Sequence, residues 1–257
     1  MSRRDDVMGL YRPSEILEKI EKVLFGLDIV TALVAMVSNE NISSAAIVVQ
    51  IVVALLYFVS NTIDDGCFWY EAEKQRRKNG IQNGLGMRLS EYDTEEYYNN
   101  NLPHSLEKYG MNILESNYFS KVIAGKMLLK VGVYALGAVV ALVIACRFVS
   151  DENVLLLIAQ TAFSSYVLVN FVMLVLYKIR LEALYSEAYN VLILGNQTHG
   201  HQAWLISYVV EYEAIKAHYK IRLEQKIFNR LNSELSTKWQ DVVDHRIAEE
   251  INPASRM

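Results

Sequence analysis

The sequence has few of the residues that cross-link small folds or build metal sites. It contains two cysteines, three prolines and five histidines in 257 residues. Cys67 follows one apolar segment and Cys146 lies inside another, so no disulfide framework is expected and a reducing compartment suits both. His199 and His201 are the only close histidine pair, and no cysteine or carboxylate cluster flanks them. We therefore expect no metal site.

Catalytic motifs are also missing. The chain has no P-loop, dinucleotide fingerprint, nucleophile elbow or zinc-protease helix motif. Asp64 and Asp65 are adjacent, so their carboxylates would point to different faces of a helix and make a poor acid/base pair. The net charge of −4 argues against a protein that coats nucleic acid. These absences favour a protein that is not an enzyme and has no DNA or RNA partner.

Long apolar runs, by contrast, are prominent. Four windows are almost wholly apolar, with most of the charge between them: 22–38, 42–60, 131–149 and 154–177. At about 1.5 Å of rise per residue, about 19 helical residues cross the ~30 Å hydrocarbon layer of a membrane. Each window is therefore predicted to be a transmembrane helix. A large soluble protein with buried helices is the alternative.

Lysine and arginine are distributed unevenly around these windows. Of the 25, four lie in residues 1–21, nine in 61–130 and ten from Lys178 onward. The short connections 39–41 and 150–153 have none and carry acidic residues instead. By the positive-inside rule, both termini and the long linker are cytoplasmic.

The pattern predicts an all-α integral membrane protein with four transmembrane helices arranged as two hairpins. We expect the linker and the tail to build one helical cytoplasmic domain. The expected regions are an N-terminal amphipathic helix (1–21), a first hairpin (22–60), a cytoplasmic linker (61–130), a second hairpin (131–177) and a C-terminal cytoplasmic helical region (178–257).

Start and stop signals place helices in the polar regions. Pro13 and Ser14 precede apolar residues at helical spacing, which predicts a helix that runs into the first window. A helix that leaves the membrane after Asn61 is expected to end near Gly80. Another is expected from about Leu106 into the third window.

The tail is predicted to form two helices. The first continues from Lys178 to Leu194, where glycines mark a turn. In the second, apolar residues recur every four positions from Ile215 to Ile247. Because each step of four advances the face by about 40°, this stripe winds around the helix. Either the helix breaks, near residues 232–233, or other helices contact it on successive sides.

Polar side chains inside the apolar windows are candidates for a pore or for interhelical hydrogen bonds, because each is costly in lipid. They are Asp28, Gln50, Ser164, Ser165 and Asn170. Asp28 lies near the edge of its window and could equally anchor its helix at the interface. For Gln50 and Asn170, interhelical hydrogen bonding is the favoured interpretation.

Several short motifs of the linker resemble a known family. They are the run from Arg76 to Gly86, Leu89-Ser90, Tyr97-Tyr98-Asn99-Asn100, Asn112 and the run from Glu115 to Lys121. Together with the paired spans and the long helical tail, they make the chain similar to the SMODS-associated four-transmembrane effector family over nearly its whole length.

The resemblance implies a membrane effector of bacterial anti-phage defence, in CBASS-like systems, located in the inner membrane. A cyclic nucleotide, made by a partner nucleotidyltransferase-type enzyme, would activate or restrain it. The spans, as a homo-oligomer, would disrupt or permeabilise the lipid bilayer. The implied ligand is a cyclic di- or oligonucleotide, with no other cofactor.

The linker offers side chains suited to such a ligand. Basic groups pair with phosphates, tyrosines stack on bases, and asparagines read base edges or ribose hydroxyls. The candidates are Arg76, Arg77, Lys78, Tyr97, Tyr98, Asn83, Asn99, Asn100 and Asn117. A basic triplet close to a membrane is alternatively a topological signal or a lipid contact.

Two other functions fit the topology alone. One is a non-enzymatic membrane scaffold whose tail recruits a cytoplasmic partner. The other is a small ion channel that conducts without any nucleotide.

Overall fold

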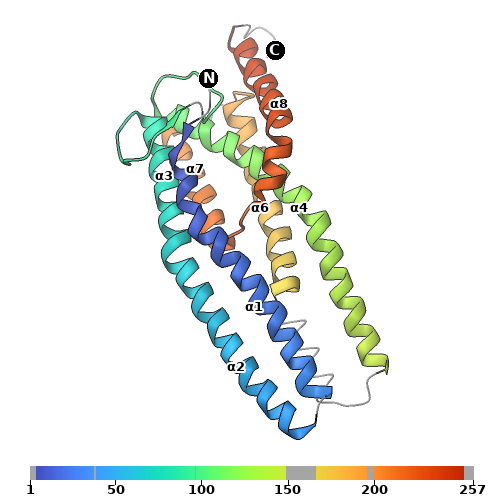
Figure 1. Cartoon of the computed structure of the whole chain (residues 1–257). Helices are drawn as coiled ribbons and strands as arrows, with labels where there is room; N and C mark the ends of the chain where they lie inside the picture. Colours follow the sequence, from blue (N-terminus) through green and yellow to red (C-terminus); the bar gives the residue numbers. More distant parts are fainter. Residues whose placement is uncertain (1–3, 38, 96, 149–165, 196–199, 252–257) are drawn as a thin grey trace. The chain divides into compact units, whose positions relative to one another are not determined.

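A computed structural model describes residues 4–37, 39–95, 97–148, 166–195 and 200–251 (Figure 1). These residues are almost entirely helical, which confirms the predicted all-α class. The elements are β1 (Arg4–Asp5), the 3-10 helix η1 (Asp6–Tyr11), α1 (Arg12–Val37), α2 (Glu40–Ile63), the π-helical turn η2 (Asp64–Phe68), α3 (Trp69–Leu85), β2 (Thr94–Glu95), α4 (Leu106–Phe148), α6 (Tyr166–Leu192), α7 (His201–Tyr219) and α8 (Gln225–Ile251).

The chain divides into two compact units. The first contains residues 1–82 and 87–97, and the second contains residues 83–86 and 98–257. The boundary falls inside the stretch 61–130, which the sequence presents as one linker. Its first part packs with the N-terminal helices and its second part with the tail.

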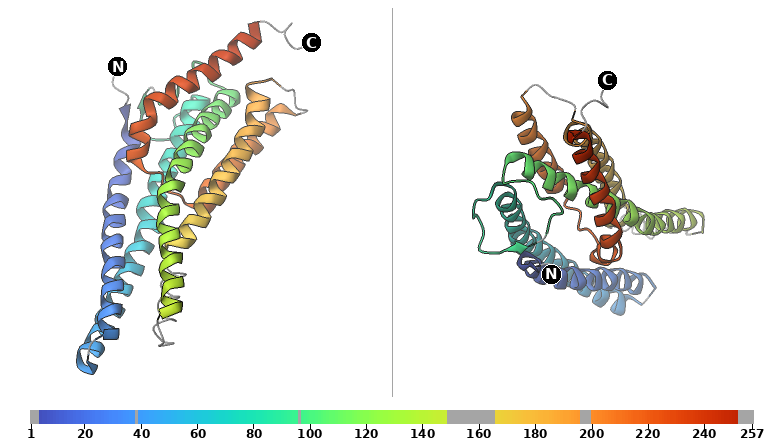
Figure 2. Two further views of the ribbon diagram at one scale, coloured as in Figure 1. Left: turned by 90° about the vertical axis from the view of Figure 1, so that its right-hand side faces the viewer. Right: turned by 90° about the horizontal axis from the view of Figure 1, so that it is seen from above.

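In the first unit, α1 and α2 run side by side as a hairpin (Figures 1 and 2). Asn39 caps α2, because its side-chain oxygen accepts the N–H of Ile42 at 3.2 Å. Ser43 Oγ donates to the carbonyl of Ala35 at 2.7 Å and ties the two helix ends together. The buried apolar residues of the pair are small enough for close approach: Ala32, Ala46 and Val53.

The helix that follows the hairpin is longer than predicted. The turn η2, with Asp64 buried, connects α2 to α3, and α3 ends at Leu85 rather than near Gly80. Gly80 is buried inside the helix. Here the glycine permits close packing and does not end the helix. The chain then folds back, and β2 pairs antiparallel with β1, Asp5 facing Thr94.

In the second unit, α4 begins at Leu106 as expected and runs unbroken to Phe148. Ser105 caps its start by accepting the N–H of Lys108 at 3.1 Å. Helices α6, α7 and α8 pack on α4 (Figure 2). The turn after α6 uses Gly195 at φ 65°, which confirms the predicted stop of the first tail helix.

The apolar stripe of the tail, whose residues recur every four positions, is divided between two helices. α7 ends where Lys220 adopts a left-handed conformation, φ 48°, and α8 begins at Gln225. The break therefore lies at residues 220–224, and the expectation of a break near residues 232–233 is wrong. The turn redirects α8 so that Ile227 and Leu235 pack against Ile123 of α4.

Two helical stretches are long and apolar enough to cross a membrane, within Glu40–Leu85 and Leu106–Val140. Their large apolar side chains are mostly exposed, for example Phe58 at 66% and Leu129 at 78%. Exposed apolar surface of this extent indicates association with a membrane. The first predicted span contains two charged residues, Lys22 and Asp28, and residues 154–165 of the fourth lie outside the described residues.

Candidate functional site

The first unit contains an open cleft of about 500 Å³ between α3 and the segment that folds back along it. Its volume lies in the range of small-molecule sites, about 300–1,000 Å³. Lys78 and Arg88 provide two cations, and Tyr92 provides an aromatic ring. The lining residues are Gln75, Lys78, Arg88, Leu89, Ser90, Glu91 and Tyr92.

Three side-chain amides on one face of α3 hold the returning segment in place. Gln82 Oε1 accepts the N–H groups of Leu89 and Ser90 at 3.0 and 3.1 Å. Gln75 Oε1 accepts the Ser90 hydroxyl at 3.1 Å. Asn79 Nδ2 donates to the carbonyl of Tyr92 at 2.6 Å. The far wall of the cleft is thus fixed by hydrogen bonds at both its start and its end.

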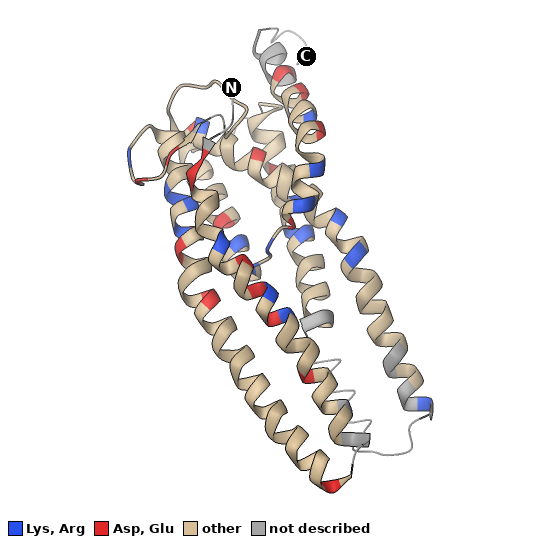
Figure 3. Ribbon diagram, in the orientation of Figure 1, with Lys and Arg blue, Asp and Glu red and all other residues tan. Residues whose placement is uncertain are grey.

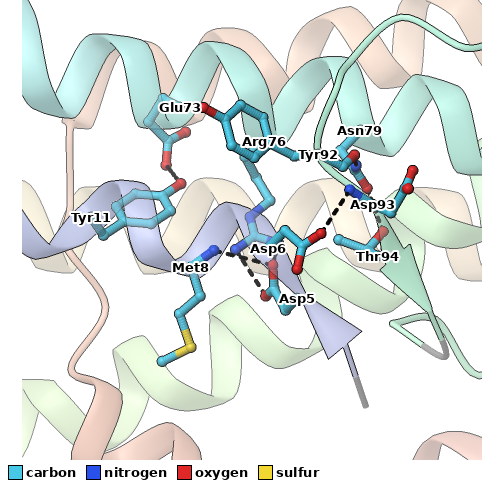
Figure 4. A network of polar contacts seen from close by, with 10 residues as sticks. All are labelled: Asp5, Asp6, Met8, Tyr11, Glu73, Arg76, Asn79, Tyr92, Asp93 and Thr94. Atoms are coloured by element: carbon cyan, nitrogen blue, oxygen red, sulfur yellow. Dashed lines mark hydrogen bonds and ion pairs between the residues drawn. The ribbon is translucent and has the colours of Figure 1, made fainter.

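The other side of the same segment is bonded to the N-terminus of the chain (Figure 4). Thr94 donates to Asn79 of α3, and on the N-terminal side the carbonyl of Asp93 accepts the N–H of Asp6 at 3.2 Å. The N–H of Asp93 donates back to Asp6 Oδ2 at 3.4 Å. Residues 88–95 therefore line the cleft and also hold the strand that leads through η1 into α1.

Arg76 connects α3 to this N-terminal strand. Its two terminal nitrogens each donate to a carboxylate oxygen of Asp5 at 3.0 Å, and both side chains are only 17% exposed. Tyr97 and Tyr11 stand over the guanidinium, with ring centroids 4.9 and 5.8 Å from Cζ. Burial acts to lower the pKa of Arg76, but Tyr97, Asp5 and Tyr11 outweigh it, so the pKa stays above its ordinary value.

Among the nine residues predicted to bind a nucleotide, only Lys78 lines the cleft. Arg77 lies 3.6 Å from Glu73, which also accepts the hydroxyl of Tyr11 at 2.9 Å. Arg76 and Tyr97 belong to the network just described. The first unit therefore brings together the basic triplet and Tyr97, but it uses most of them to fix the fold.

The predicted asparagines belong to the second unit, where Asn83, Asn99 and Asn100 bond to side chains of α4. Asn112 is fully buried, donates to Asn83 at 2.8 Å and accepts from Asn100 at 2.5 Å. The backbone N–H and side-chain amide of Asn99 both donate to Glu115, at 2.9 and 2.5 Å to its two oxygens. These bonds hold residues 99–100 against α4.

Asn117 is fully buried between α4 and α6. Its amide, oriented so that both ends are satisfied, donates to the carbonyl of Leu181 at 3.1 Å and accepts the N–H of Tyr185 at 3.2 Å. Tyr98 is half-buried in the same unit. Both residues thus lie in the second unit, whereas the cleft belongs to the first.

Lys121, which like Asn117 contacts Tyr185, lies in an aromatic environment. Lys121 Nζ lies 3.1 Å from the ring centroid of Tyr185 and 5.5 Å from that of Tyr118. Burial lowers the pKa of Lys121 to about 8; the charge of Glu182 opposes this shift and that of Lys178 adds to it.

The polar residues of the predicted spans are placed as follows. Asp28 on α1, Gln50 on α2 and Asn170 on α6 are half-buried. The hydroxyl of Thr31 donates to the backbone carbonyls of Leu27 and Asp28, at 2.9 and 3.0 Å. Ser164 and Ser165 lie outside the described residues.

Sequence analysis missed the residues that build the cleft. Gln75, Asn79 and Gln82 are amides at positions i, i+4 and i+7, a spacing that places them on one face of a helix. That spacing was the available signal. Arg88 and Tyr92 have no such pattern, because their positions depend on how the chain folds back.

Within the part of the chain that the structure describes, no three His, Cys, Asp or Glu side chains are grouped to hold a metal ion. In comparisons with protein-family models, curated proteins and solved structures, nothing matched this chain.

Proposed function

We propose that this chain is a non-enzymatic membrane effector of bacterial anti-phage defence, controlled by a cyclic nucleotide that binds the cleft of the first unit. The chain crosses the inner membrane four times, with both termini in the cytoplasm, and acts by permeabilising the bilayer as a homo-oligomer. The partner that supplies the ligand is a nucleotidyltransferase-type enzyme.

The observation that carries this proposal is the composition of the cleft. Lys78 and Arg88 can pair with phosphates, and Tyr92 can stack on a base. Gln75 and Ser90 add polar groups for base edges or ribose hydroxyls. Among the described residues, this combination of two cations, an aromatic ring and neutral donors in one concave site suits a nucleotide better than an apolar ligand.

The hydrogen bonds between the cleft segment and the N-terminal strand and helix supply a means of control. A ligand that moves Ser90 or Tyr92 pulls on Asp93, which is bonded to Asp6. Helix α1 begins directly after η1, so there is no flexible spacer between this network and the first hairpin. A shift in the cleft is therefore passed to α1 as a change in the strand and the 3-10 helix before it.

The binding step can be tested on the purified full-length chain in neutral detergent. We expect isothermal calorimetry against a panel of cyclic di- and trinucleotides to detect one binder. Because hydrogen bonds to charged groups contribute about 1.5–3 kcal/mol each, the double variant Lys78→Gln/Arg88→Gln should bind at least about tenfold more weakly. A matched control, Arg12→Gln/Lys74→Gln, removes the same charge from the same unit outside the cleft.

The effector step needs a second measurement, in bacteria that carry a membrane-potential dye. The membrane potential should collapse in only one of the two conditions, with or without the cyclic nucleotide. The Lys78→Gln/Arg88→Gln variant should lose this dependence on the nucleotide. Equal affinities of the two double variants would contradict the site. A potential that never changes would contradict the effector role, and ion flux that ignores every nucleotide would favour a channel.

A further inference from the structure

A group of basic residues, here called the basic collar, lies at the edge of the second unit's exposed apolar surface. We define the collar as residues 126–130, 178–180 and 216–230, which hold nine lysines and arginines against one carboxylate, Glu224. The following stretch of α8, residues 231–251, holds two against five. The positive charge is therefore gathered at one level of this unit and is not a general property of it.

Contacts within the unit bring these ranges together. Glu224 accepts from Lys130 at 3.0 and 3.1 Å, and its N–H lies 3.5 Å from the sulfur of Met127. The rings of Tyr177 and Tyr219 are 6.0 Å apart, which joins the end of α7 to α6. The side chain of Lys178 lies across Gly125, since a Cβ there would be 3.2 Å from its Cε.

The collar also marks where charge ends along the helices. Beyond Lys130, α4 exposes Val133 and Leu136, and before Lys178, α6 exposes Val172 and Leu176. Figure 3 shows the blue positions of α4 next to its long uncharged stretch. Lysine and arginine at such a boundary place their apolar stems on the hydrocarbon side and their charges at the level of lipid phosphates.

We infer that the collar binds the phosphates of anionic phospholipids, with the exposed side chains of Lys126, Arg180 and Lys226 as principal contacts. This inference rests on the proposed insertion of the second unit in a membrane, but not on nucleotide binding. Lys130 and Lys178 already pair with Glu224 and Glu182, so they are less available to lipid; the Lys130 pair also joins α4 to the turn before α8.

The ligand chemistry is a phosphate paired with one or more cations of the collar. A lipid supplies an acyl chain that lies on the adjacent apolar surface, whereas a free phosphate does not. The two sources can therefore be separated by adding the phosphate with and without its acyl chains.

The test uses thermal unfolding of the full-length chain in neutral detergent with added phosphatidylglycerol or phosphatidylcholine. We expect phosphatidylglycerol to give a Tm about 3 °C or more above that in phosphatidylcholine, because it binds only the folded state. The difference should shrink in 1 M salt. Glycerol phosphate and inorganic phosphate at the same concentration should give no comparable rise.

Variants identify the residues. Lys126→Gln/Arg180→Gln/Lys226→Gln should lose most of the phosphatidylglycerol effect and keep its Tm in phosphatidylcholine, which shows that it folds. The control Arg12→Gln/Lys108→Gln/Lys238→Gln loses the same charge elsewhere and should keep the effect. Equal Tm in the two lipids, or an equal effect in both triple variants, would overturn the inference. A Lys78→Gln/Arg88→Gln chain should respond to phosphatidylglycerol as the unaltered chain does. Loss of nucleotide binding can therefore be distinguished from loss of lipid binding.

Discussion

Replacing Arg76 by methionine is expected to release the N-terminal strand from α3. Methionine keeps much of the volume of the side chain but removes both hydrogen bonds to Asp5 and the cation between Tyr11 and Tyr97. The Asp5 carboxylate is then left largely buried opposite an apolar group. The substitution therefore affects the connection between the cleft segment and α1 without touching the cleft lining.

The size of the effect follows from the geometry. Removing one partner of a fully buried ion pair costs about 3–5 kcal/mol. Both side chains here retain 17% exposure, so water can partly solvate the orphaned carboxylate. We therefore expect about 2–3 kcal/mol of local destabilisation, which corresponds to a roughly 30- to 150-fold larger equilibrium constant for opening of the strand.

Hydrogen exchange measured by mass spectrometry reports this opening directly. The N–H of Asp6, bonded to Asp93, should lose protection by about that factor in Arg76→Met, while exchange in α8 should not change. Lys74→Met is the matched control: its pair with Glu71 is on the same helix but well exposed, and such pairs contribute little. Unchanged protection of Asp6 in Arg76→Met would refute the assigned role of the pair.

Two further predictions concern the second unit. A Cβ at Gly84 would lie 2.5 Å from Cβ and 2.8 Å from Cα of Tyr109, so Gly84→Ala should lower the Tm by several degrees. Gly66 has open space around it, so the control Gly66→Ala should keep its Tm. Equal Tm values of the two variants would contradict the close packing at Gly84. Burial lowers the pKa of Lys121 to about 8, while the unfolded chain keeps that proton to about 10.5. The unfolded state therefore binds more protons between these pH values, so the Tm should rise with pH from about 8 to 10. Lys121→Met should remove that rise. A rise of Tm with pH that persists in the variant would assign the effect to another group.

Elements with a local signal were predictable from the sequence. Helix α4 follows from its periodicity and from the start at Leu106, and the stop after α6 follows from Gly195. The break at residues 220–224 was not predictable in this way, because Lys220 in a left-handed conformation has no sequence signature. Tertiary packing of Ile227 and Leu235 on α4 determines where that helix must turn.

The candidate site shows the same division. The basic triplet was visible in the sequence, but the partner of Arg76 is Asp5, far away along the chain. No local pattern pairs these two residues, so an arginine expected to meet phosphate is found bonded to a carboxylate. Lys78 differs from its neighbours only in the face of α3 that it occupies, and the returning segment decides which face becomes the cleft.

The positions of the two carboxylates Asp5 and Asp6 determine how a ligand could act on the first hairpin. Asp5 binds α3 through two charge-assisted bonds, whereas Asp6 meets the cleft segment through longer bonds of 3.2 and 3.4 Å. The weaker of the two attachments is thus the one that a ligand in the cleft can alter. Because the Arg76 pair holds the strand to α3 meanwhile, we expect ligand binding to turn η1 and α1 about this fixed point and not to detach the N-terminus.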